Sequence, residues 1–278
     1  YSLGAKKTPH YDWEEVAHEA FPAGEPAGTL GQLPQLRKFD LATRDRNRAN
    51  VLAQVTPSDV LAFTGSFGLA NDDFKESVYG LLWNKSNNFS FDVSYNPTYD
   101  LALFASYTRE NFNYAVKSRQ RVPVVGTTRA NDTTNNDWSS DLEDLANTFG
   151  FGFSWSVVPE QVDFSLDFSL SDGRGTIATR ALGNPADPRF LVTSAQNYPD
   201  TRSILRQMRA SVGYRLTDHF TPRLEYRFEG YSESYFNQDV MEPYMVPVDP
   251  ASSGGVFLGA RQPGYSAHMI YLVLSYSF

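Results

Sequence analysis

Four histidines are the residues of this chain best suited to bind a metal ion or to move a proton. His10, His18, His219 and His268 are scattered over the 278 residues, and none of their separations matches that of metal ligands. A hydrolase that pairs Ser with His needs neighbours that orient the imidazole, and no histidine here has them. We therefore expect surface or interfacial histidines, no catalytic or metal site, and a protein that is not an enzyme.

Three further motifs resemble ligand-binding segments, and each fits a simpler interpretation better. Residues 131–137 (NDTTNND) offer oxygen ligands for calcium but lack the Gly and Glu spacing of an EF-hand, which favours a solvated loop. The Gly-Phe-Gly sequence at 150–152 lies inside a predicted strand and not in a nucleotide-binding turn. The basic run 37–48 is interleaved with aspartates, which favours paired charges over a phosphate groove.

Composition excludes several classes of protein. Cysteine is absent, so the chain has no disulfide framework, no thiolate site and no C-x-x-C-H motif for covalent haem. The net charge of −8 argues against nucleic acid as a partner. Aromatic residues are plentiful (20 Phe, 16 Tyr and 4 Trp) although only 41% of residues are apolar. That mixture suits strands with one apolar and one wet face, and no run reaches the ~18 apolar residues of a membrane helix.

The stretch 265–278 (YSAHMIYLVLSYSF) alternates strictly, which predicts a strand. One face holds His268 and the apolar row, and the other holds Ala267, Met269, Tyr271, Val273, Ser275 and Ser277. A strand that ends in an aromatic residue suits an outer-membrane barrel, whose outward face meets lipid. The apolar row also resembles the C-terminal signal read by the outer-membrane assembly machinery. Its residues are Ile270, Leu272, Leu274, Tyr276 and Phe278.

Eight other segments alternate in the same way, and very short turns join them in pairs. The nine predicted strands are 48–56, 60–68, 87–95, 101–114, 148–158, 162–171, 206–216, 223–231 and 265–278. The connections between pairs are long and polar: 69–86, 115–147, 172–203 and 232–264. Short periplasmic turns and long extracellular loops are typical of an antiparallel transmembrane β-barrel of the outer-membrane type. We therefore predict an all-β barrel in the Gram-negative outer membrane, in contact with its lipid.

The predicted strand number indicates an incomplete barrel. Bacterial single-chain barrels have even strand numbers, so a partner strand is either missing from this stretch or lies in residues 1–20, where His10–Phe21 could form part of it. We expect one barrel region over residues 1–278, with a partial strand and an extracellular loop in 1–47 and nine strands in 48–278. The chain begins at Tyr1 with no signal sequence, and we interpret it as the C-terminal part of a longer chain.

The polar face of the predicted strands carries charges of both signs, which we expect to point into the lumen. An arginine at mid-bilayer on the lipid face costs about 2–4 kcal/mol, so these side chains belong inside. A hydrated wall of paired charges and a docking surface for an enclosed protein explain them equally well. The lumen-facing or partner-facing candidates are Arg44, Arg46, Arg48, Arg209, Arg215, Arg223, Glu225, Arg227 and Glu229.

Several motifs in order resemble a known family. They are LRKFDLATRDRNR from Leu36, VLAQVTPSDVLAFTGSFG, DDFKESVYGL, SRQRVP, NDWSSDLEDLANTFGFGFSW and the closing PGYSAHMIYLVLSYSF. Together they resemble the C-terminal part of the MtrB/PioB family of decahaem-cytochrome-associated outer-membrane proteins, over roughly residues 36–278.

The resemblance implies a role in extracellular electron transfer. Members of that family are large barrels that hold a periplasmic decahaem c-type cytochrome, whose haem chain conducts electrons across the outer membrane, with an extracellular multihaem cytochrome as a further partner. The haems would belong to the cytochrome, and no cofactor is expected in this chain. Because aqueous channels need about 16 strands, nine or ten strands imply part of a larger barrel.

Two other functions remain open from the sequence. A general porin or substrate-diffusion channel with no bound cytochrome would have a wide open lumen and would conduct ions. A surface β-rich adhesion protein would be extracted without detergent, and its electrophoretic mobility would not shift on heating.

Overall fold

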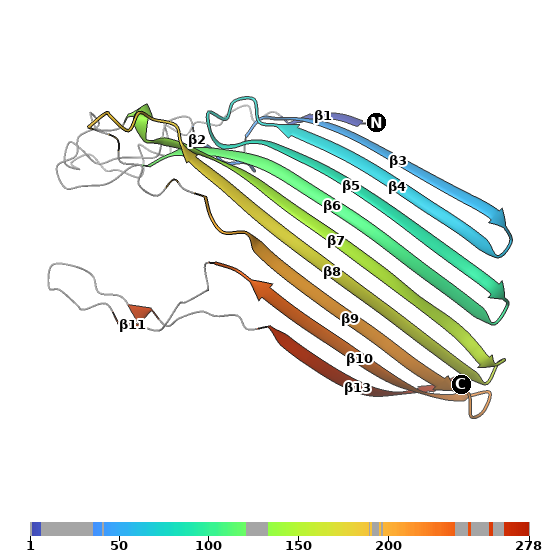
Figure 1. Ribbon diagram of the computed structural model, residues 1–278. Coiled ribbons are helices and arrows are strands. Elements are labelled where there is room, and N and C mark those ends of the chain that lie inside the picture. Colours follow the sequence, from blue (N-terminus) through green and yellow to red (C-terminus); the bar gives the residue numbers. More distant parts are fainter. Residues whose placement is uncertain are drawn as a thin grey trace.

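The computed structural model is dominated by one antiparallel sheet (Figure 1). It describes residues 2–6, 36–40, 42–120, 133–188, 190, 195, 197–236, 244–245, 256–257 and 264–277. The strands lie in chain order: β1 (Ser2–Lys6), β3 (Arg44–Ser58), β4 (Leu61–Asp73), β5 (Tyr79–Thr98), β6 (Leu101–Arg119), β7 (Asp137–Val158), β8 (Val162–Ala181), β9 (Thr201–Tyr214), β10 (Phe220–Ser234) and β13 (Tyr265–Tyr276).

Smaller elements lie at the ends of these strands. The two-residue β2 (Leu36–Arg37) pairs in parallel with β5, and the 3-10 helix η2 (Thr134–Asn136) directly precedes β7. The pair β11 (Tyr244–Met245) and β12 (Val256–Phe257) forms a separate two-stranded sheet. Among the described residues no helix is long and apolar enough to span a membrane.

All nine predicted strands are confirmed, but several extend further than predicted at the end opposite the short turns. β5 begins at Tyr79 and β7 at Asp137, so much of the predicted connections 69–86 and 115–147 is strand. The alternation ends earlier because polar side chains occur on both faces of these extensions. The predicted tenth strand at His10–Phe21 lies outside the described residues, whereas β1 pairs with β3.

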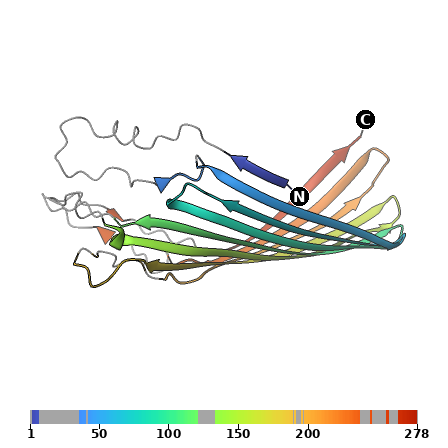
Figure 2. The ribbon, with the colours of Figure 1, turned by 90° about the horizontal axis from the view of Figure 1, so that it is seen from above.

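The sheet is open and curved. Figure 2 shows a trough in which β13 rises away from the central strands. β1 and β13 form its two edges and do not pair with each other in the described part of the chain. The short turns all lie at one end of the trough and the long connections at the other, as the sequence predicts (Figure 1).

Exposure identifies the polar face as the concave one. Side chains diverge on the outside of a curved sheet and converge on the inside. Phe149 and Phe151, on the apolar face of β7, are 50% and 51% exposed. Asp72 and Glu225, on the opposite face of the sheet, are each only 4% exposed. The apolar face is therefore convex.

Aromatic side chains pack across neighbouring strands on the convex face. The rings of Tyr107 and Phe149 lie 4.8 Å apart between centroids, and those of Phe151 and Phe168 lie 5.2 Å apart. Offset contacts of this kind stabilise a sheet without a second layer behind it. The result is an apolar outer belt, the feature that a barrel wall presents to hydrocarbon.

Candidate functional site: the concave face

The β3 end of the concave face is basic. Arg44, Arg46 and Arg48 lie in one row on β3, and register places them beside the end of β4. Asp72 of β4 receives a two-pronged contact from Arg46, with 2.6 Å from Nε to Oδ1 and 2.6 Å from Nη2 to Oδ2. Arg44 lies 3.7 Å from the same carboxylate. One aspartate thus faces three arginines, and this part of the wall retains positive charge.

Charges at the other end of the concave face are paired. Glu225 of β10 accepts from Arg209 of β9 at 2.8 Å and also contacts Arg227. The Arg227 guanidinium lies 5.1 Å from the centre of the Tyr271 ring on β13. Glu225 thus joins Arg209 to Arg227, and Arg227 reaches Tyr271. These contacts form a continuous network across β9, β10 and β13.

Glu229 continues the same row toward the long connections. It accepts from Gln207 at 2.9 Å and from the Tyr265 hydroxyl at 2.5 Å. Arg223 lies on the same face opposite Gly213. Arg215 differs from the other candidates, because it lies one residue beyond β9, where its backbone N–H donates to Gln161 O at 2.8 Å. It is an exposed residue of the short-turn end.

Between these two regions the concave face is acidic, which the candidate residues from the sequence did not include. The register places five carboxylates on the inner face of β5 to β8, and no Lys or Arg of these four strands shares the paired rows around them. The acidic zone consists of Asp92, Glu110, Asp144, Asp163 and Asp167. The alternation in the sequence already indicated a polar face here, but isolated carboxylates carry no motif.

Few of these carboxylates are neutralised by the described residues. Asp163 accepts from the Ser156 hydroxyl at 2.6 Å, and Asp144 accepts from the Tyr114 hydroxyl at 3.3 Å. Asp167 lies opposite Arg209 of β9. Hydroxyl donors leave the negative charge in place, so the acidic zone presents net negative charge to whatever occupies the trough.

Small side chains keep the same part of the concave face nearly flat. Gly150 and Gly152 of β7 face inward, since a Cβ at Gly150 would meet the Ser106 hydroxyl at 2.5 Å and one at Gly152 would meet the Phe104 ring. Open hollows of about 600 Å³ and 370 Å³ lie along this face. The larger is lined by Ser154, Asp163, Ser165, Ser211 and Arg223, among others.

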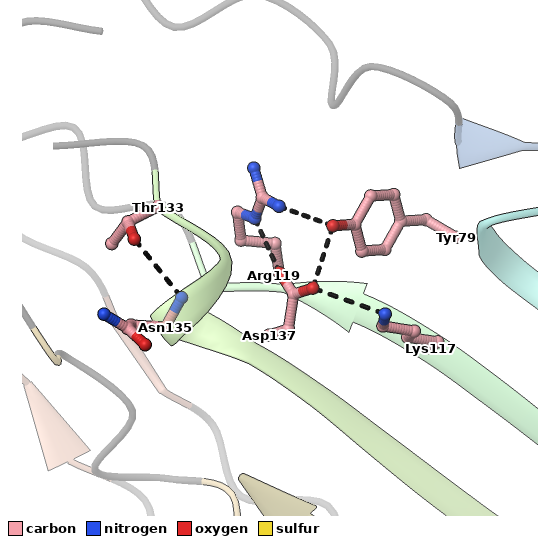
Figure 3. A network of polar contacts seen from close by, with 6 residues as sticks. All are labelled: Tyr79, Lys117, Arg119, Thr133, Asn135 and Asp137. Atoms are coloured by element: carbon pink, nitrogen blue, oxygen red, sulfur yellow. Dashed lines mark hydrogen bonds and ion pairs between the residues drawn. The ribbon is translucent and has the colours of Figure 1, made fainter. Parts of the chain in front are cut away.

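A buried polar cluster holds the loop end of the sheet together. Figure 3 shows Tyr79, Lys117 and Arg119 converging on Asp137. The Asp137 carboxylate accepts from Arg119 Nε at 2.6 Å and from the Tyr79 hydroxyl at 2.8 Å, and Lys117 Nζ lies 3.4 Å away. Tyr79 and Asp137 are each 4% exposed. Burial, with the nearby Asp137 charge, raises the pKa of Tyr79, so the phenol remains a hydrogen-bond donor.

The backbone beside this cluster requires glycine. Gly80 has φ of +99°, and a Cβ there would lie 2.4 Å from the carbonyl oxygen of Arg37. This is the point at which β2 pairs with β5. The left-handed conformation and the close approach both exclude a side chain, so Gly80 fixes the segment that contains Arg37 against the sheet.

The other motifs from the sequence do not form a ligand site. Asn131 and Asp132 of the run 131–137 lie outside the described residues. Within 133–137, Asn135 donates to Asp187 at 2.5 Å and Asp137 belongs to the buried cluster, so these two side chains do not converge on one point. No group of three His, Asp or Glu side chains suitable for a metal occurs in the described part of the chain. His268 accepts or donates at 2.7 Å to the Tyr226 hydroxyl on the convex face.

The proposed assembly-signal residues lie along the convex face of the edge strand β13. Ile270, Leu272, Leu274 and Tyr276 are 61–73% exposed. Their partners on β10 include Tyr226 and Leu224, which face the same way. Phe278 lies outside the described residues.

Comparison with known proteins agrees with this geometry. The family profile described as "Putative outer membrane beta-barrel porin, MtrB/PioB" matches residues 14–278. The chain belongs to the MtrB/PioB family. A related protein, "Outer membrane protein MtrB" of Shewanella baltica (strain OS185), is 27% identical over 244 residues, which cover 87% of this chain and 31% of that protein.

Solved structures support the fold of this MtrB/PioB chain. The copper transporter OprC matches with a TM-score of 0.52, and BauA, the ferric preacinetobactin receptor from Acinetobacter baumannii, with 0.54. Each is 8% identical, and the match covers 84% of this chain and 35% or 37% of the other. The chain thus spans about a third of the length of these proteins, and the match shows the fold of an outer-membrane β-barrel.

Proposed function

We propose that this chain forms part of a barrel that sheathes a multihaem, decahaem c-type cytochrome and so insulates an electron conduit across the outer membrane. Membership of the MtrB/PioB family supports this role. The observation that carries the proposal is the concave face, where the acidic zone lies on a floor of glycine and serine between two arginine-containing regions. Such a surface permits close approach and offers charges to a folded protein.

Insulation is the physical task of such a wall. A chain of haems needs close spacing and separation from lipid, and non-helical protein is tolerated at membrane depth only inside a closed wall. The convex belt would meet the lipid while the concave face positions the cytochrome. The haems belong to the partner, because this chain has no Cys for covalent attachment. The rest of the wall would come from the remainder of a longer barrel, since about 16 strands are needed for an aqueous lumen.

The first test is a visible absorption spectrum of the full-length native protein, extracted from outer membranes in mild detergent and purified through a tag on this chain. A strong c-type Soret band in constant ratio to the barrel supports the proposal. A colourless barrel that still shifts in mobility on heating contradicts it, and leaves the fold unaffected.

A second test locates the contact. Replacing Asp163 and Asp167 by Lys reverses two charges of the acidic zone, and we expect less cytochrome to be retained as salt is raised. The matched control is Asp59→Lys, an exposed aspartate in the short turn between β3 and β4. Equal retention in both variants would show that the acidic zone does not contact the cytochrome.

The alternative is a diffusion channel, which the family description as a porin favours. In that case the charged concave face would act as a hydrated, ion-selective wall. Planar-bilayer recordings of the purified barrel distinguish the two functions, because an open channel conducts steadily and a barrel filled by a cytochrome does not.

A further inference from the structure

Three arginines gather on the convex face of β8 and β9, at the outer border of the apolar belt. Arg174 and Arg202 lie directly opposite each other in the ladder, and Arg206 lies four residues further along β9, opposite Leu170 and beyond Ile204 on the same face. Asp172 is the one carboxylate between them, and it accepts from Arg202 at 2.9 and 2.7 Å. The cluster therefore carries two more positive charges than negative ones.

Like charges directly opposite each other destabilise a sheet unless something neutralises them. Asp172 forms an ion pair with the guanidinium of Arg202, and the Arg202 side chain remains 48% exposed. Arg174 and Arg206 are exposed on the outward face. The described contacts thus leave an excess of positive charge on a surface that adjoins the lipid-facing belt.

The position of the three arginines along β8 and β9 matches the end of a segment long enough to cross the hydrocarbon of a membrane. From Val162 the outward face of β8 is apolar up to Leu170, which agrees with the ~9–11 residues a tilted strand needs to cross hydrocarbon. The first outward charge on β8 follows at Asp172. On β9 the outward Met208 precedes Arg206 in the same direction away from the short turns. The charges therefore begin directly beyond a segment of the length that crosses the hydrocarbon.

We propose that Arg174, Arg202 and Arg206 bind the phosphate groups of an anionic membrane lipid, the phosphorylated glycolipid of the outer leaflet. Guanidinium groups are the side chains best matched to phosphate, because their planar forks donate two parallel hydrogen bonds. Charge complementarity and continuity with the apolar belt favour a lipid, whose acyl chains would lie along β8 and β9 while its phosphates reach the arginines.

The neighbouring strand supplies a surface for the acyl chains. Gly230 of β10 lies opposite Arg206, and the Phe228 ring leans over the space that a Gly230 side chain would fill. His268 of β13 lies against Phe228, with 5.1 Å between ring centroids. Aromatic side chains at the interface between hydrocarbon and headgroups are typical of barrels in the outer membrane.

The test measures lipid retained by the full-length protein after extraction in mild detergent, by native mass spectrometry with bisphosphorylated lipid A as the probe. Each cation near an anionic lipid surface contributes a factor of about five, so Arg174→Gln with Arg206→Gln should lower affinity roughly 25-fold. Arg215→Gln, at the opposite end of β9, is the matched control and should bind as wild type. Unchanged retention in the double variant would overturn the proposal.

A second variant, Asp172→Asn, tests the proposal with all three arginines in place. Asp172→Asn frees Arg202 and removes the carboxylate that competes with phosphate, so lipid A retention should rise, and a fall would contradict the proposal. Monophosphorylated lipid A should bind more weakly than the bisphosphorylated form. Displacement of lipid A by millimolar inorganic phosphate would instead identify a free-anion site and overturn the assignment to a lipid. Heat-modifiable mobility of each variant confirms that the barrel is folded.

Discussion

Two adjacent residues of β8 offer a direct test of which face meets lipid. Leu166 and Ser165 are neighbours in sequence and face opposite sides of the sheet. Leu166 is four residues into β8, near the middle of the ~9–11 residues that cross the hydrocarbon. We predict that Leu166→Arg is strongly destabilising and that Ser165→Arg is tolerated.

The expected difference follows from the surroundings. An arginine at mid-bilayer on the lipid face costs about 2–4 kcal/mol, which is roughly 30- to 900-fold in the folding equilibrium. Ser165→Arg loses one hydroxyl contact, 2.8 Å from the Ser211 hydroxyl, worth about 0.5–1.5 kcal/mol. The new arginine would lie between Asp163 and Asp167 on the same face, and their charges would offset part of that loss.

The assay is urea unfolding of the full-length barrel in lipid vesicles, followed by its heat-modifiable mobility. Leu166→Lys provides a second cation at the same site, and Ser165→Lys is its control. Equal destabilisation at both positions would refute the assignment of faces. Full tolerance of Leu166→Arg would show that the convex belt does not meet hydrocarbon.

Three further outcomes are expected. Gly152→Ala should destabilise the barrel by about 1–3 kcal/mol in the same unfolding assay, because its Cβ would lie 2.4 Å from Leu166 O and 2.6 Å from the Phe104 ring; Gly65→Ala, with nothing within 4 Å, should be neutral. Tyr79→Phe should expose the loop end to limited proteolysis, since it removes a buried donor to Asp137 worth about 1–3 kcal/mol, whereas Tyr99→Phe, 93% exposed, should not. Because the pKa of Tyr79 is raised, its contribution should be complete below the unfolded value near pH 10 and be lost as pH rises through the folded value, and proteolysis at constant salt checks this.

The centres of the strands were predictable from the sequence because one face of each strand meets lipid and the other meets water. In β7 the run 149–156 alternates Phe and Trp with Gly and Ser, so one residue faces lipid and the next faces the lumen. The extension 137–147 of the same strand carries polar side chains on both faces, with Asp141 and Glu143 on one and Ser140 and Asp144 on the other. Without an apolar face the period-two signal fades, and the sequence places the start of the strand too late.

The candidate site was predictable only where charges are dense. Arg223, Glu225, Arg227 and Glu229 stand out on one strand, and their shared face follows from spacing alone. The partners of Glu225 require the register between β9 and β10, which a single sequence does not supply. The Tyr79–Asp137 contact joins residues 58 positions apart and has no local signal at all.

The two faces of the sheet differ in what neutralises their charged side chains. On the convex face, the outward charges begin beyond the apolar belt, where headgroup phosphates can neutralise the arginines of β8 and β9. On the concave face, Asp72 and Glu225 are neutralised by arginines of the wall itself. The acidic zone between them is different, because β5 to β8 supply no cation of their own to its rows. Apart from Arg209 of β9, which lies opposite Asp167, the described residues leave the counter-charge of this zone to water, ions or a partner in the trough. Which of these supplies it distinguishes a channel from a sheath.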